Sequence, residues 1–407
     1  MPIAPMALRR LALRCGGGFI GLAVLLALAW FMGWQQPLGR LDPALVIPWL
    51  MPILCWQAWR MRRQSLLAAG ASAVGLLTAL MAVQAAMVLF WADASAGVLA
   101  AQILAVALAF VLCWLISGMV VRWHRLHGAL IFGICCALTL VWLVAAHMAL
   151  SGAYSPARAG AGAGRAIMIT SLPLRWAGSD DFTDIFAGRT HDDIVLQKLE
   201  HLGPISMVDS LDGTALTPDQ TLFLAHPRAM TPQDLVAVDA HVRSGGRALI
   251  LADALSSWPA AHPLGDTRNP PITSLLTPLL DHWGIILSAA AHGEGGATWQ
   301  GGRDHGLWLH SNGRFHRWPP QCQILGDNRA LTCQIGRGRA VILGDADLLY
   351  APLWEPEGWD AAHLMKSDVL YWTAQQLWGR HVARRWLQPI WIKPEYRRAA
   401  GIAQLYD

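Results

Sequence analysis

The stretch that decides the fold of the second half of the chain is Leu222–Asp253, which reads LFLAHPRAMTPQDLVAVDAHVRSGGRALILAD. It begins and ends in short, continuous apolar runs, which are typical of strands covered on both faces. Between these runs Thr231 can cap a helix that begins at Pro232, and the pair Gly245-Gly246 can end it. The stretch therefore predicts one strand–helix–strand unit with parallel strands.

The same alternation extends in both directions along the chain. Short apolar runs predict strands at 166–170, 221–225, 247–252 and 339–343, and amphipathic patterns predict helices at 191–202, 232–243, 272–283 and 361–378. Strands that alternate with helices are typical of a parallel sheet covered on both faces. We therefore expect residues 166–380 to form an α/β domain with a doubly wound, mostly parallel sheet.

The first 150 residues have a different composition. The whole chain is 54% hydrophobic and only 14% charged, whereas soluble domains have about 25% charged residues. Five apolar runs account for the difference, at 15–34, 44–59, 65–91, 98–121 and 129–150. Four are long enough to cross a bilayer. The second is short and contains Pro48 and Pro52, so a re-entrant or kinked segment is its alternative interpretation. We expect a transmembrane bundle of about five helices over 1–150.

Arginines between these runs indicate the topology. If all five runs span, eight arginines lie on one side of the membrane and only Arg40 lies on the other. The positive-inside rule then predicts a cytoplasmic N-terminus and a periplasmic domain after Leu150, in a bacterial inner membrane. Because the basic residues lie between apolar runs, they indicate a lipid bilayer as partner and no nucleic acid. The eight arginines are Arg9, Arg10, Arg14, Arg60, Arg62, Arg63, Arg122 and Arg125.

Two further segments complete the organisation of the chain. Residues 151–165, SGAYSPARAGAGAGR, consist mostly of small residues without apolar periodicity and predict a flexible linker. Residues 381–407 form a basic, apolar tail that contains Pro389-Ile390-Trp391-Ile392. Three placements of the tail are open: on a partner, on anionic lipid headgroups, or folded back on the α/β domain.

A family resemblance rests on two places in the α/β domain. The first comprises His226-Pro227, Thr231-Pro232, Leu235, Asp239, Val242 and Gly245-Gly246-Arg247, and the second is Gly344-Asp345-Ala346-Asp347. In these features the chain resembles the GldG-type auxiliary components of uncharacterised ABC-type transport systems. The resemblance covers about residues 166–380 and implies a class I glutamine amidotransferase-like fold. Relatives often carry membrane segments on both sides of this domain, whereas here five apolar runs precede it and none follows it.

The predicted strand ends lack the nucleophile of that fold. Class I amidotransferases place a Cys on a sharp strand–helix turn, but the strands here are followed by His226-Pro227, Asp253-Ala254 and Gly344-Asp345. The sequence also has no G-x-S-x-G, H-E-x-x-H, P-loop or G-x-G-x-x-G motif. We therefore expect a non-catalytic protein without a cofactor, which works with an ABC permease and an ATPase encoded as a separate chain.

Acidic residues offer the one candidate binding site. Asp253, Asp345 and Asp347 follow strands at the edge where open α/β sheets bind ligands. They predict a polar ligand or cation site, and helix capping with loop hydrogen bonding is the alternative. No metal site is predicted from a second, Gly-rich cluster, because its spacing matches no metal motif. That cluster comprises His292, Glu294, Asp304, His305, His310 and His316.

Cys322 and Cys333 flank a predicted hairpin. The segment CQILGDNRALTC has strand-like flanks around Asp327-Asn328, two residue types that tolerate a tight turn. A two-residue turn there places Cys322 directly opposite Cys333, where a disulfide can form. Two buried free thiols are the alternative, because a register slip of one residue would turn them to opposite faces.

Together these features give one leading hypothesis for the function and two alternatives. The leading hypothesis is a non-catalytic, membrane-anchored auxiliary subunit of an ABC-type transport or export system, whose outer domain binds a partner or substrate. The alternatives are an envelope hydrolase or amidotransferase-like enzyme with its site around Asp253, Asp345 and Asp347, and a receptor that senses a ligand in the sheet crevice.

Overall fold

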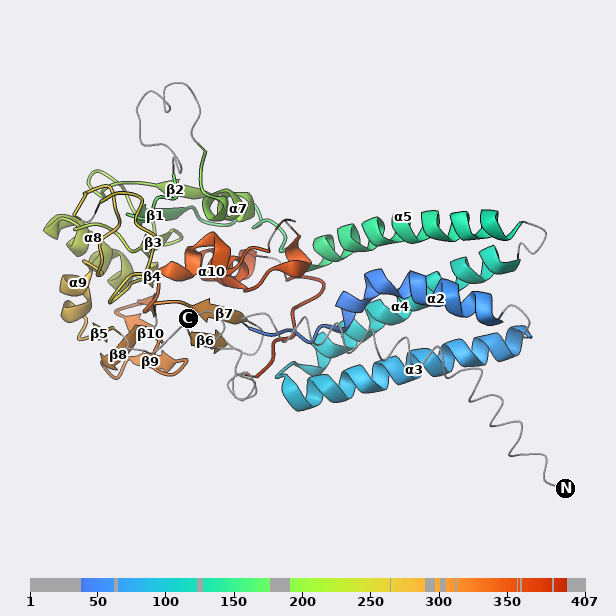
Figure 1. The fold of residues 1–407 in the computed structure, drawn as a ribbon. Helices are drawn as coiled ribbons and strands as arrows, with labels where there is room; N and C mark the ends of the chain where they lie inside the picture. Colours follow the sequence, from blue (N-terminus) through green and yellow to red (C-terminus); the bar gives the residue numbers. More distant parts are fainter. Residues whose placement is uncertain are drawn as a thin grey trace. The chain divides into compact units, whose positions relative to one another are not determined.

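The computed structural model divides the chain into two compact units (Figure 1). The helical unit comprises Met1–Ser155, Trp359–Leu364 and Arg385–Ile402, and the sheet unit comprises Pro156–Gly358, Met365–Arg384 and Ala403–Asp407. The structure describes residues 38–61, 65–122, 127–175, 191–263, 265–289, 297–300, 305–311, 313–356, 358, 361–382 and 384–393.

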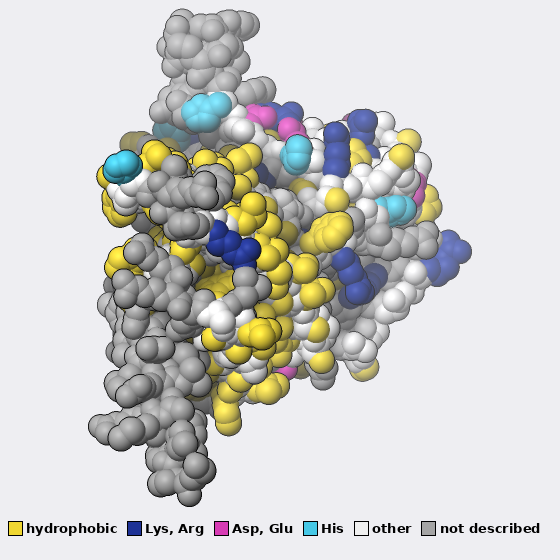
Figure 2. Space-filling view, turned by 90° about the vertical axis from the view of Figure 1, so that its right-hand side faces the viewer, with side chains coloured by type: hydrophobic (Ala, Val, Ile, Leu, Met, Phe, Trp, Pro, Cys, Tyr) yellow, Lys and Arg dark blue, Asp and Glu magenta, His cyan; other side chains and the backbone are white. Residues whose placement is uncertain are grey.

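Three helices of the helical unit are long and apolar enough to cross a membrane: α3 (Leu66–Trp91), α4 (Ala96–Arg122) and α5 (Gly128–Tyr154). Their large apolar side chains are exposed, which is favourable only where lipid or another apolar surface covers them. Figure 2 shows hydrophobic side chains gathered over the helices that face the viewer. Examples of such exposed side chains are Leu67, Leu89, Phe90, Phe132 and Met148.

The second predicted run forms a shorter helix. The 3-10 turn η1 (Pro43–Val46) leads into α2 (Ile47–Met61), which contains Pro52. Leu50, Met51 and Leu54 of α2 are each only 1% exposed, because the helix packs in the core of the unit with residues of α3, α4 and α5. The first predicted run, 15–34, lies outside the described residues. The described part of the chain therefore has three long apolar helices.

The tail returns to the helical unit. The N–H of Ile390 donates to the Asp42 carboxylate, and the N–H of Leu41 donates to the carbonyl of Ile390 at 2.8 Å. Farther along, the N–H of Lys393 donates to the carbonyl of Trp91 at 2.8 Å. The placement on the α/β domain is therefore wrong for this part of the tail, where Leu387, Ile390 and Ile392 pack in cores of the helical unit, whereas Val382 at the start of the tail packs in a core of the sheet unit.

A buried polar group lies where the tail meets the helices. Arg40 forms an ion pair with Asp42, and Asp42 also accepts the hydroxyl of Tyr154 at 3.0 Å. The guanidinium of Arg40 donates to the carbonyl of His363 at 2.7 Å. A buried ion pair costs desolvation energy, and these extra hydrogen bonds offset that cost. Together with the bridge between Ala92 and Ile392 in the tail, they join residues 40, 92 and 154 at one end of the unit.

The sheet unit contains a mixed seven-stranded sheet in the order β2-β1-β3-β4-β11-β10-β9. The first five strands are parallel to one another, and β10 and β9 are antiparallel to their neighbours. Two small sheets pair β5 with β8 and β6 with β7. The strands are β1 (Ala166–Thr170), β2 (Ile205–Met207), β3 (Thr221–Ala225), β4 (Arg247–Leu251), β5 (Ile286–Ser288), β6 (Ala297–Gln300), β7 (Gly306–Leu309), β8 (Arg314–Arg317), β9 (Cys322–Leu325), β10 (Ala330–Ile335) and β11 (Gly338–Leu343).

Helices cover both faces of the large sheet (Figure 1). Alternate strand residues such as Met168 and Phe223 pack with α7 (Ile194–Leu202) and α10 (Val369–Trp378). Their neighbours, such as Ile167 and Leu222, pack in a second core with α8 (Pro232–Arg243) and α9 (Thr277–His282). This is why the parallel strands read as continuous apolar runs.

The predicted elements are found with some changes of length. The helix predicted at 232–243 is confirmed as α8, where Thr231 and Asp234 form a capping box. The helix predicted at 272–283 begins only at Thr277, because the N–H of Ser274 instead donates to the carbonyl of Asp253 at 2.6 Å. The helix predicted at 361–378 begins at Val369 and is preceded by the separate 3-10 turn η4 (Ala362–Leu364).

The predicted linker at 151–165 differs from the structure at its start. Helix α5 continues to Tyr154, which is buried in the core of the helical unit. Beyond it, the N–H of Ala159 donates to the carbonyl of Leu202 at 2.7 Å, and Ala159 and Ala163 pack against a core of the sheet unit. The start of the predicted linker therefore belongs to helix α5, and Ala159 and Ala163 belong to the sheet unit.

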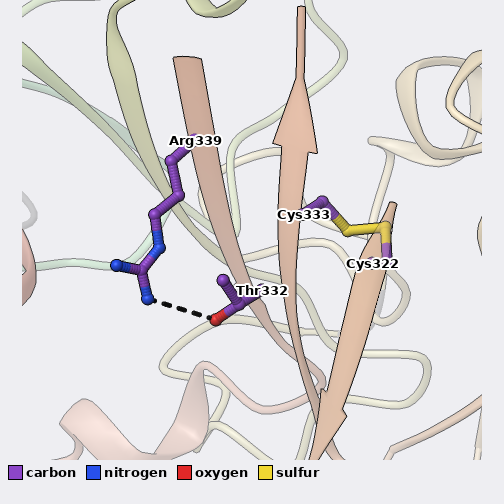
Figure 3. Close-up of a disulfide and its surroundings, with 4 residues drawn as sticks. All are labelled: Cys322, Thr332, Cys333 and Arg339. Atoms are coloured by element: carbon purple, nitrogen blue, oxygen red, sulfur yellow. Dashed lines mark hydrogen bonds between the residues drawn. A yellow bond between two sulfur atoms is a disulfide. The ribbon is translucent and has the colours of Figure 1, made fainter. Parts of the chain in front are cut away.

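Cys322 and Cys333 form a disulfide between β9 and β10 (Figure 3). They are direct cross-strand partners, as are Leu325 and Ala330 next to the turn. Asp327 and Asn328 have φ angles of 55° and 65°, the left-handed geometry that a two-residue hairpin turn requires. On the next strand pair, Arg339 reaches toward the hydroxyl of Thr332 (Figure 3).

Thiol labelling tests this disulfide. The chain has seven cysteines, and we expect five to react in the denatured, unreduced full chain and all seven after reduction. The double variant Cys322→Ala/Cys333→Ala should lose about 2–3 kcal/mol of unfolding free energy, because a closed loop restricts the unfolded chain. Cys136→Ala, which removes an exposed free cysteine, is the matched control. Seven reactive thiols without reduction would contradict the bond.

Candidate functional site

Three predicted site residues lie together in the sheet unit. Asp253 follows β4, and Asp345 and Asp347 follow β11, the strand parallel to β4. Parallel neighbours end at the same edge of a sheet, so these carboxylates converge there. Each has an oxygen within 4.8 Å of an oxygen of the other two. All three side chains are buried, with exposures of 0%, 1% and 1%.

Donors from two segments hold Asp253. The hydroxyl of Ser311 donates to Asp253 Oδ1, and the N–H of Ala346 donates to Asp253 Oδ2 at 2.9 Å. Its backbone carbonyl accepts the N–H of Ser274. The carboxylate therefore connects the end of β4 with the segments that follow β7 and β11.

Asp345 and Asp347 are held in the same way. Asp345 accepts the N–H of His310, and its Oδ1 accepts the N–H of Leu348 at 2.9 Å. Asp347 begins the 3-10 turn η2 (Asp347–Leu349) and accepts two bonds from Ser256–Ser257, a hydroxyl at 2.7 Å and an N–H at 2.6 Å. Each of the six carboxylate oxygens thus accepts a hydrogen bond.

His226 is a further candidate residue at this edge, which the sequence analysis did not select. It follows β3, is fully buried, and has a φ of 49°, a conformation that non-glycine residues seldom adopt. Its Nε2 lies 2.7 Å from the carbonyl oxygen of Pro271, and its Nδ1 lies 3.9 Å from Asp253 Oδ2. Among the described residues Nδ1 has no hydrogen-bond partner. Its position in the sequence could have indicated it, because His226 directly follows β3, the strand that pairs with β4.

The electrostatics of this cluster are unfavourable for three bare carboxylates. Burial, together with the charges of Asp345 and Asp347, raises the pKa of Asp253 well above its usual value. Burial and the charge of Asp347 raise the pKa of Asp345 to about 7. Burial lowers the pKa of His226, which favours its neutral form. In the described part of the chain, no Lys or Arg forms an ion pair with the three aspartates.

A cleft of about 250 Å³ reaches the cluster at Asp253. Its walls come from the segment before α9, from α9 itself and from β5, and they include Ser274, Asp281 and Leu287. Both polar and apolar groups line it, which suits a small ligand with a polar end.

The second predicted cluster does not assemble in the described residues. His305 contacts Gln375 with 2.8 Å between Nε2 and Oε1, whereas His316 lies exposed on β8. His310 contributes its backbone N–H to the aspartate cluster. His292, Glu294 and Asp304 lie outside the described residues. Within the part of the chain that the structure describes, the aspartates are the group whose geometry suits a metal ion.

Two serines near the cluster lack the partners of a catalytic nucleophile. The hydroxyl of Ser171, which follows β1, donates to the carbonyl of His226, and a carbonyl cannot act as a base. Ser311 donates to Oδ1 of Asp253, whereas Nδ1 of His226 lies 3.9 Å from Oδ2 of the same carboxylate. In a serine triad the imidazole lies between the serine and the acid. Here the carboxylate of Asp253 contacts both Ser311 and His226, so the imidazole is not the group between serine and acid.

Comparisons with protein families and with curated proteins found no match. Among solved structures, the chain is similar to the exo-beta-1,4-mannosidase Op5Man5 from Opitutaceae bacterium strain TAV5, with 13% identity over 52% of this chain and 36% of that one, at a TM-score of 0.32. It is also similar to a beta-galactosidase from Bacillus circulans sp. alkalophilus, with 13% identity over 48% of this chain and 31% of that one, at a TM-score of 0.25. The chain therefore spans about a third of the length of these structures, and likeness of this size identifies neither a shared fold nor a shared activity.

The raised pKa of Asp345 predicts a pH dependence of stability. A carboxyl with a pKa of about 7 when folded and about 3.9 when unfolded favours folding when protonated, so its contribution is lost as pH rises from 4 to 7. Relative to Asp345→Asn, the wild type should gain about 1 kcal/mol per pH unit as pH falls from 7 to 5. Urea unfolding of the full chain in detergent with EDTA measures this difference.

Comparison with the variant matters because His226 acts in the opposite direction, since burial favours its neutral form at higher pH. That contribution is common to both proteins and cancels in the difference. Parallel pH profiles for the wild type and Asp345→Asn would contradict the prediction.

Proposed function

We propose that the protein is a non-catalytic, membrane-anchored auxiliary subunit of an ABC-type transport or export system, and that its sheet unit binds a partner or substrate. The observation that carries the proposal is the edge of the sheet. The ends of β3, β4 and β11 present His226, Asp253 and Asp345 where an amidotransferase-like enzyme needs a nucleophile. An α/β domain with this edge, joined to apolar helices, suits binding at a membrane rather than turnover.

The resemblance to GldG-type components gives the class of system. In this proposal the large sheet is doubly wound. Helix packing supports this, because α7 and α10 pack on one face of the sheet and α8 and α9 pack on the other. The sheet unit then has a class I glutamine amidotransferase-like fold that binds a partner or substrate and lacks the active site of those enzymes. The partners are an ABC permease in the bilayer and an ATPase on a separate chain.

The proposed topology has five spans in a bacterial inner membrane, with a cytoplasmic N-terminus and a periplasmic sheet unit. Contacts within the helical unit support it, because they join residues 40, 92 and 154 at one end. Those residues are the start of the η1–α2 segment, the connection from α3 to α4, and the end of α5, which alternating spans place on one side. The arginine-rich connections at 60–63 and 122–125 then share the other, cytoplasmic side.

Reporter fusions test this topology. Alkaline phosphatase fused after Ser155 should be active, because it reaches the periplasm, and green fluorescent protein fused there should not fluoresce. The matched control is the same pair of reporters fused after Arg125, where the opposite result is expected. A fluorescent fusion after Ser155 would contradict the proposed orientation.

Co-purification tests the transport role. The tagged full chain, extracted in mild detergent, should bring down an ATPase subunit and a permease in fixed proportion. A tagged membrane protein of similar size from the same cells is the control for non-specific capture. If neither subunit is enriched over that control, the transport assignment is wrong.

A ligand-sensing receptor is the second candidate, and the cleft beside Asp253 favours it. An envelope hydrolase or amidotransferase-like enzyme has less support, because the described serines at the cluster donate to a carbonyl and to a carboxylate. A receptor would bind a small molecule without the ATPase and permease, so co-purification also separates these classes.

A further inference from the structure

The tautomer of His226 follows from its partner. A carbonyl oxygen has no proton to give, so the contact between Nε2 and the oxygen of Pro271 requires that Nε2 carries the hydrogen. In the neutral ring, Nδ1 is then a bare lone pair. It lies 3.9 Å from Asp253 Oδ2 and has no hydrogen-bond partner among the described residues.

Such an arrangement is costly unless a proton or a metal ion lies between the groups. A buried lone pair facing a carboxylate, beside two further carboxylates, concentrates negative charge where water cannot screen it. A histidine that binds a metal ion commonly donates its other ring N–H to a carbonyl oxygen, which fixes the ring. His226 has this arrangement, with Pro271 as the acceptor.

Distances at the cluster also suit one ion. Two ligands of a single divalent cation lie at most about 5 Å apart, because metal–oxygen distances are about 2.0–2.6 Å. Each of the three aspartates has an oxygen within 4.8 Å of an oxygen of the other two, and Nδ1 of His226 lies 3.9 Å from Oδ2 of Asp253. A carboxylate oxygen can accept two contacts, so an ion can bind beside the hydrogen bonds that hold the three carboxylates.

We propose that Asp253, Asp345, Asp347 and His226 bind one divalent cation at the ends of β3, β4 and β11. Carboxylate oxygens together with an imidazole nitrogen suit Mn²⁺ or Zn²⁺ better than Ca²⁺, which takes oxygen ligands. The ion offsets the charge of the three carboxylates and connects three neighbouring strand ends. It is independent of the transport role, because a cation can stabilise the sheet unit whether or not a permease binds it.

Metal content of the purified full chain tests the site. The protein in detergent is stripped with EDTA, loaded with Mn²⁺ or Zn²⁺, dialysed and analysed by mass spectrometry of the elements. We expect about one ion per chain in the wild type and at least a tenfold loss in both Asp345→Asn and His226→Gln. The glutamine can keep the bond to Pro271 but has no atom in the place of Nδ1. Asp212→Asn, which changes an exposed aspartate of the same unit, should bind like the wild type.

Two results would overturn the proposal. One is a wild type that retains neither ion, in which case the cluster holds protons instead. The other is retention of the ion by folded Asp345→Asn or His226→Gln, which would place the binding elsewhere, for example at the other histidines. Circular dichroism checks that the variants fold.

A second measurement on the wild type does not depend on the variants. The N–H groups of Ser257, His310 and Leu348 donate to the carboxylates, so the ion should slow their hydrogen exchange. Peptides from α8, in the second core, are the internal control and should change little. Unchanged exchange at the three N–H groups after loading would overturn the site.

Discussion

Three carboxylates in one small buried volume are the constraint on which the sheet unit depends. Asp253, Asp345 and Asp347 repel one another where no water screens them, and the surrounding chain is arranged to hold them. Hydroxyl and N–H donors from the segments after β4, β7 and β11 converge on their oxygens. Because these donors are far apart in the sequence, the cluster fixes how the loops at that edge close over the sheet. The cleft described above opens beside Asp253.

In the helical unit, too, buried charged side chains lie where segments far apart in the sequence meet. The tail pairs with the segment before α2 and with the end of α3, and Arg40 and Asp42 are buried at the junction. Residues 156–358 and 365–384 of the sheet unit therefore lie between segments that both belong to the helical unit.

Sequence patterns predicted the central strands, α8 and the Cys322–Cys333 register, because apolar alternation, capping residues and turn residues act locally. They also selected the three aspartates, since acidic residues after parallel strands share an edge. Other features depend on distant partners. The late start of α9 follows from Ser274 bonding to Asp253, and the tail's position follows from Asp42. From the sequence, His226 counts only as a residue that stands where a nucleophilic Cys would be expected. Its place in the cluster could not be predicted, because only the fold shows that its Nδ1 lies near the Asp253 carboxylate.

The central claim is that a cation joins His226 to the aspartates, and pulsed electron paramagnetic resonance of the Mn²⁺-loaded full chain tests it most directly. A nitrogen directly bound to Mn²⁺ modulates the spin echo, whereas carboxylate oxygens do not. We expect a single bound Mn²⁺ whose echo carries the modulation of one imidazole nitrogen, and loss of that modulation in His226→Gln. Bound Mn²⁺ without nitrogen modulation, or no bound Mn²⁺ at all, would contradict the account.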